Sequence, residues 1–199
     1  MSLDTIIERC LHLGIGCVAI SDHDEVQGGI ELQKIAPFSV IVAEEILTPV
    51  GEIMGMFLTE RIPSGVSPYE AIAQIRSQGG LVCLPHPFDR VRPATLSHGF
   101  PDELFSEIDI IEVFNARTLN ESYCEKARIF AAERGLLRSA GSDAHTSREI
   151  GNAYIEIPEF DSKEEFLSSL AQGEVFGHKS GMWVHIPSMF NRIKSKIKK

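Results

Sequence analysis

The chain has 199 residues, of which 43% are hydrophobic and 24% charged, and its formal net charge is -9. This length fits one domain over 1–199 that buries about 70% of its unfolded surface, and the composition excludes a disordered or membrane-embedded chain. The negative charge argues against sequence-specific or general nucleic-acid binding, because phosphate backbones are bound through clustered Lys and Arg. We expect a cytoplasmic protein with no membrane partner, and leave its oligomeric state open.

Helix-like and strand-like segments alternate along the chain. Apolar periodicity and capping residues predict helices over 2–12, 26–36, 67–78, 102–106, 121–134 and 162–171. Short apolar runs predict strands over 17–20, 39–46, 52–58, 81–84, 109–114, 136–140 and 153–157. Turn residues at 48–51 predict a hairpin between the second and third of these strands. The alternation indicates an α/β fold with a parallel sheet, closed or nearly closed.

The four cysteines have no C-x-x-C spacing, and three of them lie in apolar segments. We interpret them as reduced core residues rather than metal ligands or nucleophiles. They are Cys10, Cys17, Cys83 and Cys124.

Polar residues follow the predicted strands one after another. Taken singly, each has a structural alternative, such as a helix cap, a solvated strand end or a core histidine. Active sites of parallel sheets gather at the carboxyl ends of the strands, however, and coincidence at successive ends favours a common site. The residues concerned are Asp22, His23, Glu45, His86, Asn115, Asp143 and His145.

Asp143 and His145 are two residues apart, so on a strand end both side chains would leave the same face. A carboxylate and an imidazole held in this way suit zinc, manganese or iron. The alternative is a hydrogen-bonded structural pair. The pair becomes a metal-site candidate through the other polar residues at the strand ends.

These motifs resemble the polymerase and histidinol phosphatase (PHP) superfamily of metal-dependent phosphoesterases. The resemblance implies a distorted (β/α)7 barrel, and the segment 177–199 is similar to the C-terminal segment that accompanies some PHP domains. The motifs are Ile20-Ser21-Asp22-His23-Asp24, Glu45, Pro85-His86-Pro87, Glu112-Val113-Phe114-Asn115-Ala116 and Gly141-Ser142-Asp143-Ala144-His145.

The resemblance also implies two or three divalent ions, Zn, Mn or Fe. Glu45 would bridge two metals, and His86 would bind the second of them. His23 and His145 would serve the third metal, and Asp143 the first. The implied reaction is hydrolysis of a small phosphorylated substrate, with a nucleotide or an oligonucleotide end as candidates, by metal-activated water.

One departure from the family is large. PHP domains begin with a strand that carries D-L-H-x-H-T, and this sequence starts at the following helix. His12 cannot replace those histidines, because it lies on the solvent side of a helical pattern. We therefore expect an N-terminally incomplete chain, a barrel that lacks its first strand, metal sites that are partly occupied, and low activity.

Substrate contacts are expected from Arg92, Arg117 and His178, with the alternative that the two arginines are solvated loop residues. Asp22 and Asn115 are candidates for supporting the metal-bound water. Two other functions stay open: a non-catalytic PHP-derived binding or assembly module, and a histidinol-phosphatase-like enzyme.

Overall fold

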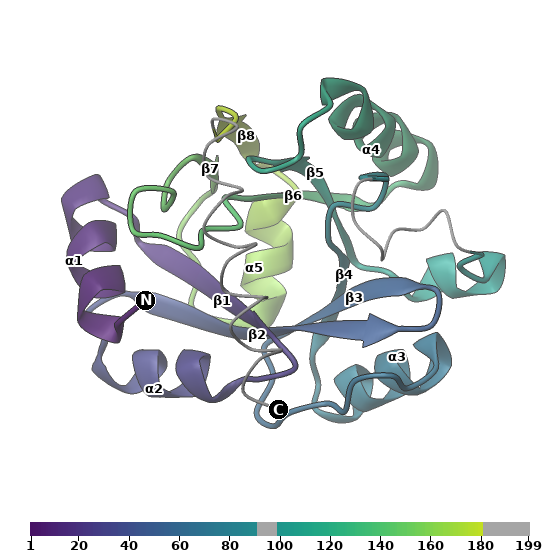
Figure 1. Ribbon diagram of the computed structural model, residues 1–199, viewed down its shortest axis with the longest axis horizontal. Helices are drawn as coiled ribbons and strands as arrows, with labels where there is room; N and C mark the ends of the chain where they lie inside the picture. The colour runs from purple at the N-terminus through teal and green to yellow at the C-terminus, as the bar shows by residue number, and fades with distance from the viewer. Residues whose placement is uncertain (91–98, 181–199) are drawn as a thin grey trace, which may run out of the picture.

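The computed structural model describes residues 1–90 and 99–180, and the chain folds around one curled sheet (Figure 1). Six strands lie side by side in the order of the sequence. They are β1 (Cys17–His23), β2 (Ser39–Thr48), β3 (Gly51–Met56), β4 (Leu81–Leu84), β5 (Ile110–Asn115) and β6 (Leu137–Gly141). β3 runs antiparallel to both of its neighbours, and all other pairs are parallel.

This topology brings one end of every strand to the same side of the sheet. The carboxyl ends of β1, β2, β4, β5 and β6 lie together with the amino end of β3, because β3 returns along the chain as the hairpin partner of β2. We call this side the carboxyl edge. The predicted hairpin is confirmed, with residues 49 and 50 as its turn.

The α/β prediction is confirmed, but the described residues form a curled half-barrel sheet rather than a (β/α)7 barrel. β1 and β6 are the two edges of this sheet, so it does not close within the described part of the chain. The reason lies in the last two strands, β7 (Ala153–Glu156) and β8 (Glu174–Gly177), which pair antiparallel with each other in a separate sheet.

Every predicted helix forms. They are α1 (Leu3–Leu13), α2 (Gln27–Ile35), α3 (Pro68–Ser77), the 3-10 helix η2 (Asp102–Glu107), α4 (Glu121–Arg134) and α5 (Lys163–Leu170). α3 shows why the sequence signals were reliable. The Ser67 hydroxyl accepts a hydrogen bond from the Glu70 N–H at 3.2 Å, and the Glu70 carboxylate accepts one from the Ser67 N–H at 3.0 Å. These two bonds satisfy backbone amides that have no carbonyl partner within the helix.

The outer face of the sheet is covered by α2, α3 and α4 (Figure 1). Alternate strand residues such as Val42, Ile53 and Val82 point to this side and are almost fully buried. They pack against apolar helix residues, including Ile75 of α3 and Ala127 of α4. This layer is the main hydrophobic core.

The inner face is filled by α5, which lies within the curve of the strands in Figure 1. Phe166 and Leu170 of α5 are buried against strand residues that precede the carboxyl edge. These strand residues are Ile41, Ala43, Met56, Leu81, Cys83 and Ile110. α5 therefore forms an apolar floor, and the inward positions nearer the carboxyl edge include the polar residues Glu45, Glu52 and Glu112.

The four cysteines are free thiols, as predicted, and three are buried, with Cys17 half-buried. Burial, with a contribution from Cys10, raises the pKa of Cys17 to about 11. Burial also raises the pKa of Cys83, which lies in the apolar floor. Raised pKa values keep these thiols protonated, so they are poor nucleophiles and metal ligands.

Among the described residues, no helix combines the length and the apolar character needed to cross a membrane.

Candidate metal centre

A histidine and two carboxylates converge on the inner face at the carboxyl edge. His23 of β1 lies opposite Glu45 of β2 in the parallel register. Glu52 of β3 lies opposite Leu47, which is two residues beyond Glu45, so strand alternation puts Glu52 on the same face. His23 Nδ1 is 3.5 Å from Glu45 Oε2 and 3.8 Å from Glu52 Oε1.

The donor set of this cluster fits a divalent cation. One ligand atom from each of His23, Glu45 and Glu52 lies within 4.8 Å of the others, and donors around a tetrahedral ion at ~2.0–2.2 Å are roughly 3.3–3.6 Å apart. The Glu45 and Glu52 side chains are each only 11% exposed, so their negative charges are poorly screened and a cation would relieve their repulsion. The His23 side chain is 52% exposed, which leaves the cluster open to solvent.

His86 extends the cluster toward the middle of the sheet. Its side chain is fully buried, and its Nε2 lies 3.4 Å from Glu52 Oε2, so the two oxygens of Glu52 face two different histidines. The His86 N–H donates to Glu112 Oε2 at 2.7 Å. Glu112 of β5 thereby fixes the backbone of a candidate ligand.

Asn115 connects this buried part to the Asp143 loop. Its side-chain amide donates to Glu112 Oε2 at 3.1 Å and lies 3.5 Å from Asp143 Oδ2. His145 Nδ1 is 2.9 Å from the Asp143 carbonyl oxygen and 3.5 Å from Asp143 Oδ1. A continuous set of contacts therefore runs along the carboxyl edge from β1 to the loop after β6.

The backbone is strained at three points of this edge. Asp24, His86 and Asp143 have positive φ angles of 56°, 27° and 50°, and they follow the ends of β1, β4 and β6. Left-handed backbone is uncommon outside glycine and concentrates where a fold holds functional groups in place. The strain supports a functional interpretation of the carboxyl edge.

Glu44, the neighbour of Glu45, belongs to the outer face. It is fully buried, and one of its oxygens accepts from the Ile62 N–H at 2.9 Å. Burial raises the pKa of Glu44, and the Ile62 hydrogen bond opposes that change. Two adjacent glutamates thus have different roles, because alternation along β2 sends only Glu45 to the cluster.

Gly141 at the end of β6 has no room for a side chain. A Cβ built there would overlap the Glu112 carboxylate. We expect Gly141→Ala to lower the free energy of unfolding by about 1–3 kcal/mol and to displace Glu112 from His86. Gly16→Ala is the matched control, since a Cβ at Gly16 meets no atom within 4 Å. Urea unfolding of both variants checks the ranking, and equal losses would contradict it.

The structure brings together several of the residues predicted from sequence. His23, Glu45 and His86 meet around Glu52, and Asn115 joins this group to Asp143 and His145. One strand boundary was wrong at a site residue: β1 continues to His23, so His23 lies within the strand rather than after it. Glu45 lies within β2, as predicted, and β2 runs on to Thr48. The assignment of His23 and His145 to one metal, and of Asp143 to another, stays a prediction.

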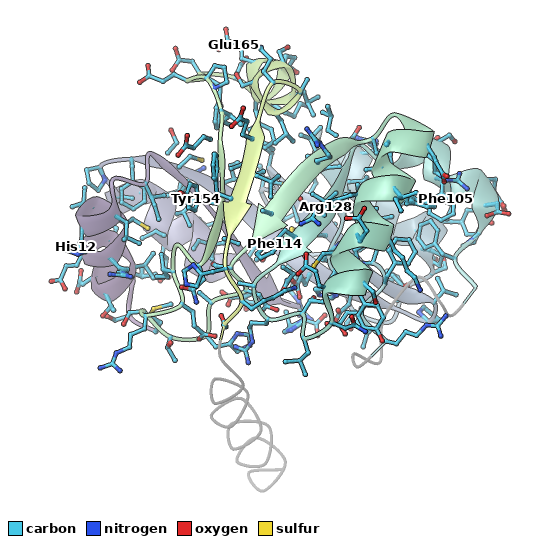
Figure 2. All side chains as sticks on the ribbon, turned by 90° about the horizontal axis from the view of Figure 1, so that it is seen from above. His12, Phe105, Phe114, Arg128, Tyr154 and Glu165 are labelled. Atoms are coloured by element: carbon cyan, nitrogen blue, oxygen red, sulfur yellow. The ribbon has the colours of Figure 1, made fainter. Side chains whose placement is uncertain are left out.

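Other predicted residues lie elsewhere. Asp22 is exposed, and its carboxylate lies near Gly28 of α2, away from the inner face. Arg117 is buried and forms an ion pair with Glu149 at 3.3 Å. His178 is exposed just after β8. His12 is exposed on α1 and, as predicted, lies away from the inner face (Figure 2).

Arg92 and the segment 181–199 lie outside the described residues. The substrate-binding role of Arg92 and most of the predicted C-terminal segment 177–199 therefore stay predictions.

Sequence reasoning missed two residues of the site. Glu52 has the clearest available signal, because a two-residue turn after Thr48 fixes the hairpin register and places Glu52 on the face of Glu45. Glu112 belonged to a recognised motif but received no role. Its function depends on a contact with the His86 backbone that no local pattern encodes.

Comparisons with known proteins give a consistent family. Residues 121–175 match the family model of PHP-associated regions. The chain is 39% identical over 140 residues, 65% of its length, to the uncharacterized protein MJ0417 of Methanocaldococcus jannaschii. It also resembles the crystal structure of a two-domain Bacteroides vulgatus protein containing a predicted PHP-like metal-dependent phosphoesterase, with a TM-score of 0.68 and 17% identity, over 89% of this chain and 61% of that one.

These matches support placing the chain in the PHP superfamily. PsfC from Pseudomonas syringae has a similar fold, with a TM-score of 0.63 and 15% identity, over 98% of this chain and 89% of PsfC. The chain spans about 60% of the length of the curated relatives it matches, 59% of one and 60% of the other. A further neighbour is a putative metal-dependent phosphoesterase from Bifidobacterium adolescentis, with a TM-score of 0.58 and 18% identity, over 73% of this chain and 83% of that one.

Proposed function

We propose that this protein is a metal-dependent phosphoesterase that hydrolyses a small phosphorylated substrate, with a nucleotide or an oligonucleotide end as candidates. The observation that carries the proposal is the convergence of His23, Glu45 and Glu52 on the inner face at the carboxyl edge, within 4.8 Å of one another. The metal-dependent phosphoesterase among the structural neighbours supports the same reaction class.

The residues have separate tasks in this proposal. His23, Glu45 and Glu52 would hold a divalent ion, and His86 lies next to Glu52 as a further donor. A bound divalent ion supplies Lewis acidity, which polarises a phosphoryl oxygen and lowers the pKa of water. Glu112 fixes the His86 backbone, and α5 closes the inner face from below. Substrate would enter from the solvent side of His23, which is exposed.

Recognition of the substrate phosphate requires positive charge beside the candidate metal centre. Arg117 was predicted to bind the phosphate and lies among the described residues. Its guanidinium, however, forms a buried ion pair with Glu149. His178 is exposed and accessible. A bound metal would itself provide positive charge for a phosphoryl group, and Arg92 keeps its predicted role.

Phosphate release from a panel of mononucleotides, short oligonucleotides and histidinol phosphate, with Mn²⁺ or Zn²⁺ added, tests the function. We expect hydrolysis of at least one nucleotide substrate, a loss of about 100-fold or more in Glu52→Gln, and wild-type rates in the control Glu174→Gln, which alters an exposed residue of β8. Hydrolysis of histidinol phosphate alone would favour the histidinol-phosphatase alternative. Metal binding without hydrolysis would favour a non-catalytic binding module.

A further inference from the structure

Glu149 is a buried carboxylate in the loop between β6 and β7. The whole residue is only 2% exposed to solvent. Glu149 Oε2 accepts from the His145 N–H at 3.1 Å, from the Thr146 N–H at 2.9 Å and from the Thr146 hydroxyl at 3.0 Å. One oxygen therefore fixes the backbone of His145 and of the residue after it.

The other oxygen of Glu149 is tied to a different part of the chain. Arg117 Nη1 donates to Glu149 Oε1 at 3.3 Å, and the Arg117 side chain is 4% exposed. Arg117 follows β5, so this ion pair connects the end of β5 to the loop after β6. At such low exposure the pair is weakly screened, and loss of one partner would leave the other charge buried.

The same loop is held at a second point. Asn115 Oδ1 accepts from the Arg117 N–H at 2.9 Å, while the Asn115 amide group lies 3.5 Å from Asp143 Oδ2. Residues 115–117 thus contact both ends of the Asp143–His145 stretch, Asp143 directly and His145 through Glu149. Asp143 has left-handed backbone, which needs such surrounding contacts to persist.

We propose that Arg117 and Glu149 form a clamp that positions His145 at the candidate metal centre. In this assignment Glu149 is a positioning residue, and Arg117 holds Glu149 instead of contacting substrate phosphate. The part of the proposal that concerns metal rests on the proposed function and on the predicted role of His145 as a metal ligand. The clamp itself is a property of the metal-free chain.

Amide hydrogen exchange, measured by NMR without metal, tests the clamp. In Glu149→Gln the amides of His145 and Thr146 are expected to exchange about tenfold faster or more. The Leu58 amide, which donates to the Val42 carbonyl at 3.0 Å in the main core, reports on overall stability and is expected to keep its rate. Arg148→Met, an exposed neighbour, is the control. Unchanged exchange at His145 and Thr146, or an equal increase at Leu58, would overturn the clamp.

A Zn²⁺ titration, followed through the NMR signal of the His145 imidazole, tests whether the clamp raises metal affinity. Outer contacts of metal ligands typically contribute 10–100-fold to affinity, so Glu149→Gln and Arg117→Met are expected to need at least about tenfold more Zn²⁺, with partial recovery in Arg117→Lys. Wild-type affinity in both variants would overturn the positioning role. If Glu149→Gln does not fold, exchange is measured on Arg117→Lys, in which a smaller increase at His145 and Thr146 is expected. Absence of any response of the wild-type His145 signal to Zn²⁺ would refute metal binding by His145 without refuting the site at His23, Glu45 and Glu52, and the exchange result would still decide the clamp.

Discussion

Glu45→Gln is expected to weaken metal binding by about 100-fold or more, since it removes a carboxylate from the centre of the cluster. The Glu45 Oε2 atom is 3.5 Å from His23 Nδ1, and the family resemblance gives this glutamate a bridging position between two metals. The amide that replaces it keeps the shape of the side chain but removes the negative charge that attracts a cation. Calorimetric titration with Mn²⁺ and Zn²⁺ measures the change.

Glu44→Gln is the matched control for this variant. Glu44 is the adjacent residue, but it faces the outer core, and its pKa is raised by burial. A neutral amide of the same shape places no charge in this buried position. We expect Glu44→Gln to bind metal as the wild type does. Equal losses in the two variants would show that the inner face has no special role in metal binding.

Phe166→Ala is expected to lower the free energy of unfolding by about 3–5 kcal/mol. Phe166 is 6% exposed at the centre of the apolar floor, and its ring makes edge contacts with Phe57 and Phe160 at centroid distances of 5.4 and 5.0 Å. Its removal would leave a cavity between α5 and the inner face of the sheet. Urea unfolding followed by circular dichroism measures the loss.

Tyr154→Ala provides the comparison, because Tyr154 stacks on Phe176 in the separate β7–β8 sheet but is 42% exposed (Figure 2). An exposed stacked pair contributes about 0.5–1.5 kcal/mol beyond its buried area. If Phe166→Ala were no more destabilising than Tyr154→Ala, α5 would not be an essential part of the core.

The helices were predictable from sequence because their signals are local. Ser2, Ser67 and Ser162 each accept a hydrogen bond from a backbone N–H of the first turn, and the helices begin where these caps predict. The residue types of the site were also predictable, since His23, Glu45 and His86 lie at one edge of a mostly parallel sheet.

Closure of the sheet was not predictable from the same signals. The segment 153–157 was correctly expected to be a strand, but its apolar pattern does not say whether it pairs with β6 or with β8. The same limit applies to Arg117. An arginine after a strand can face a substrate or a buried carboxylate, and the choice depends on Glu149, which lies 32 residues further along the chain. Contacts across such distances depend on the complete fold.

The inner face at the carboxyl edge is expected to bind divalent metal. Anomalous diffraction from crystals soaked in Mn²⁺ or Zn²⁺, recorded at the absorption edge of the metal, tests it most directly. We expect a peak about 2.0–2.3 Å from donor atoms of His23, Glu45 and Glu52. Metal bound only at other surface positions, or no peak at saturating concentration, would contradict it.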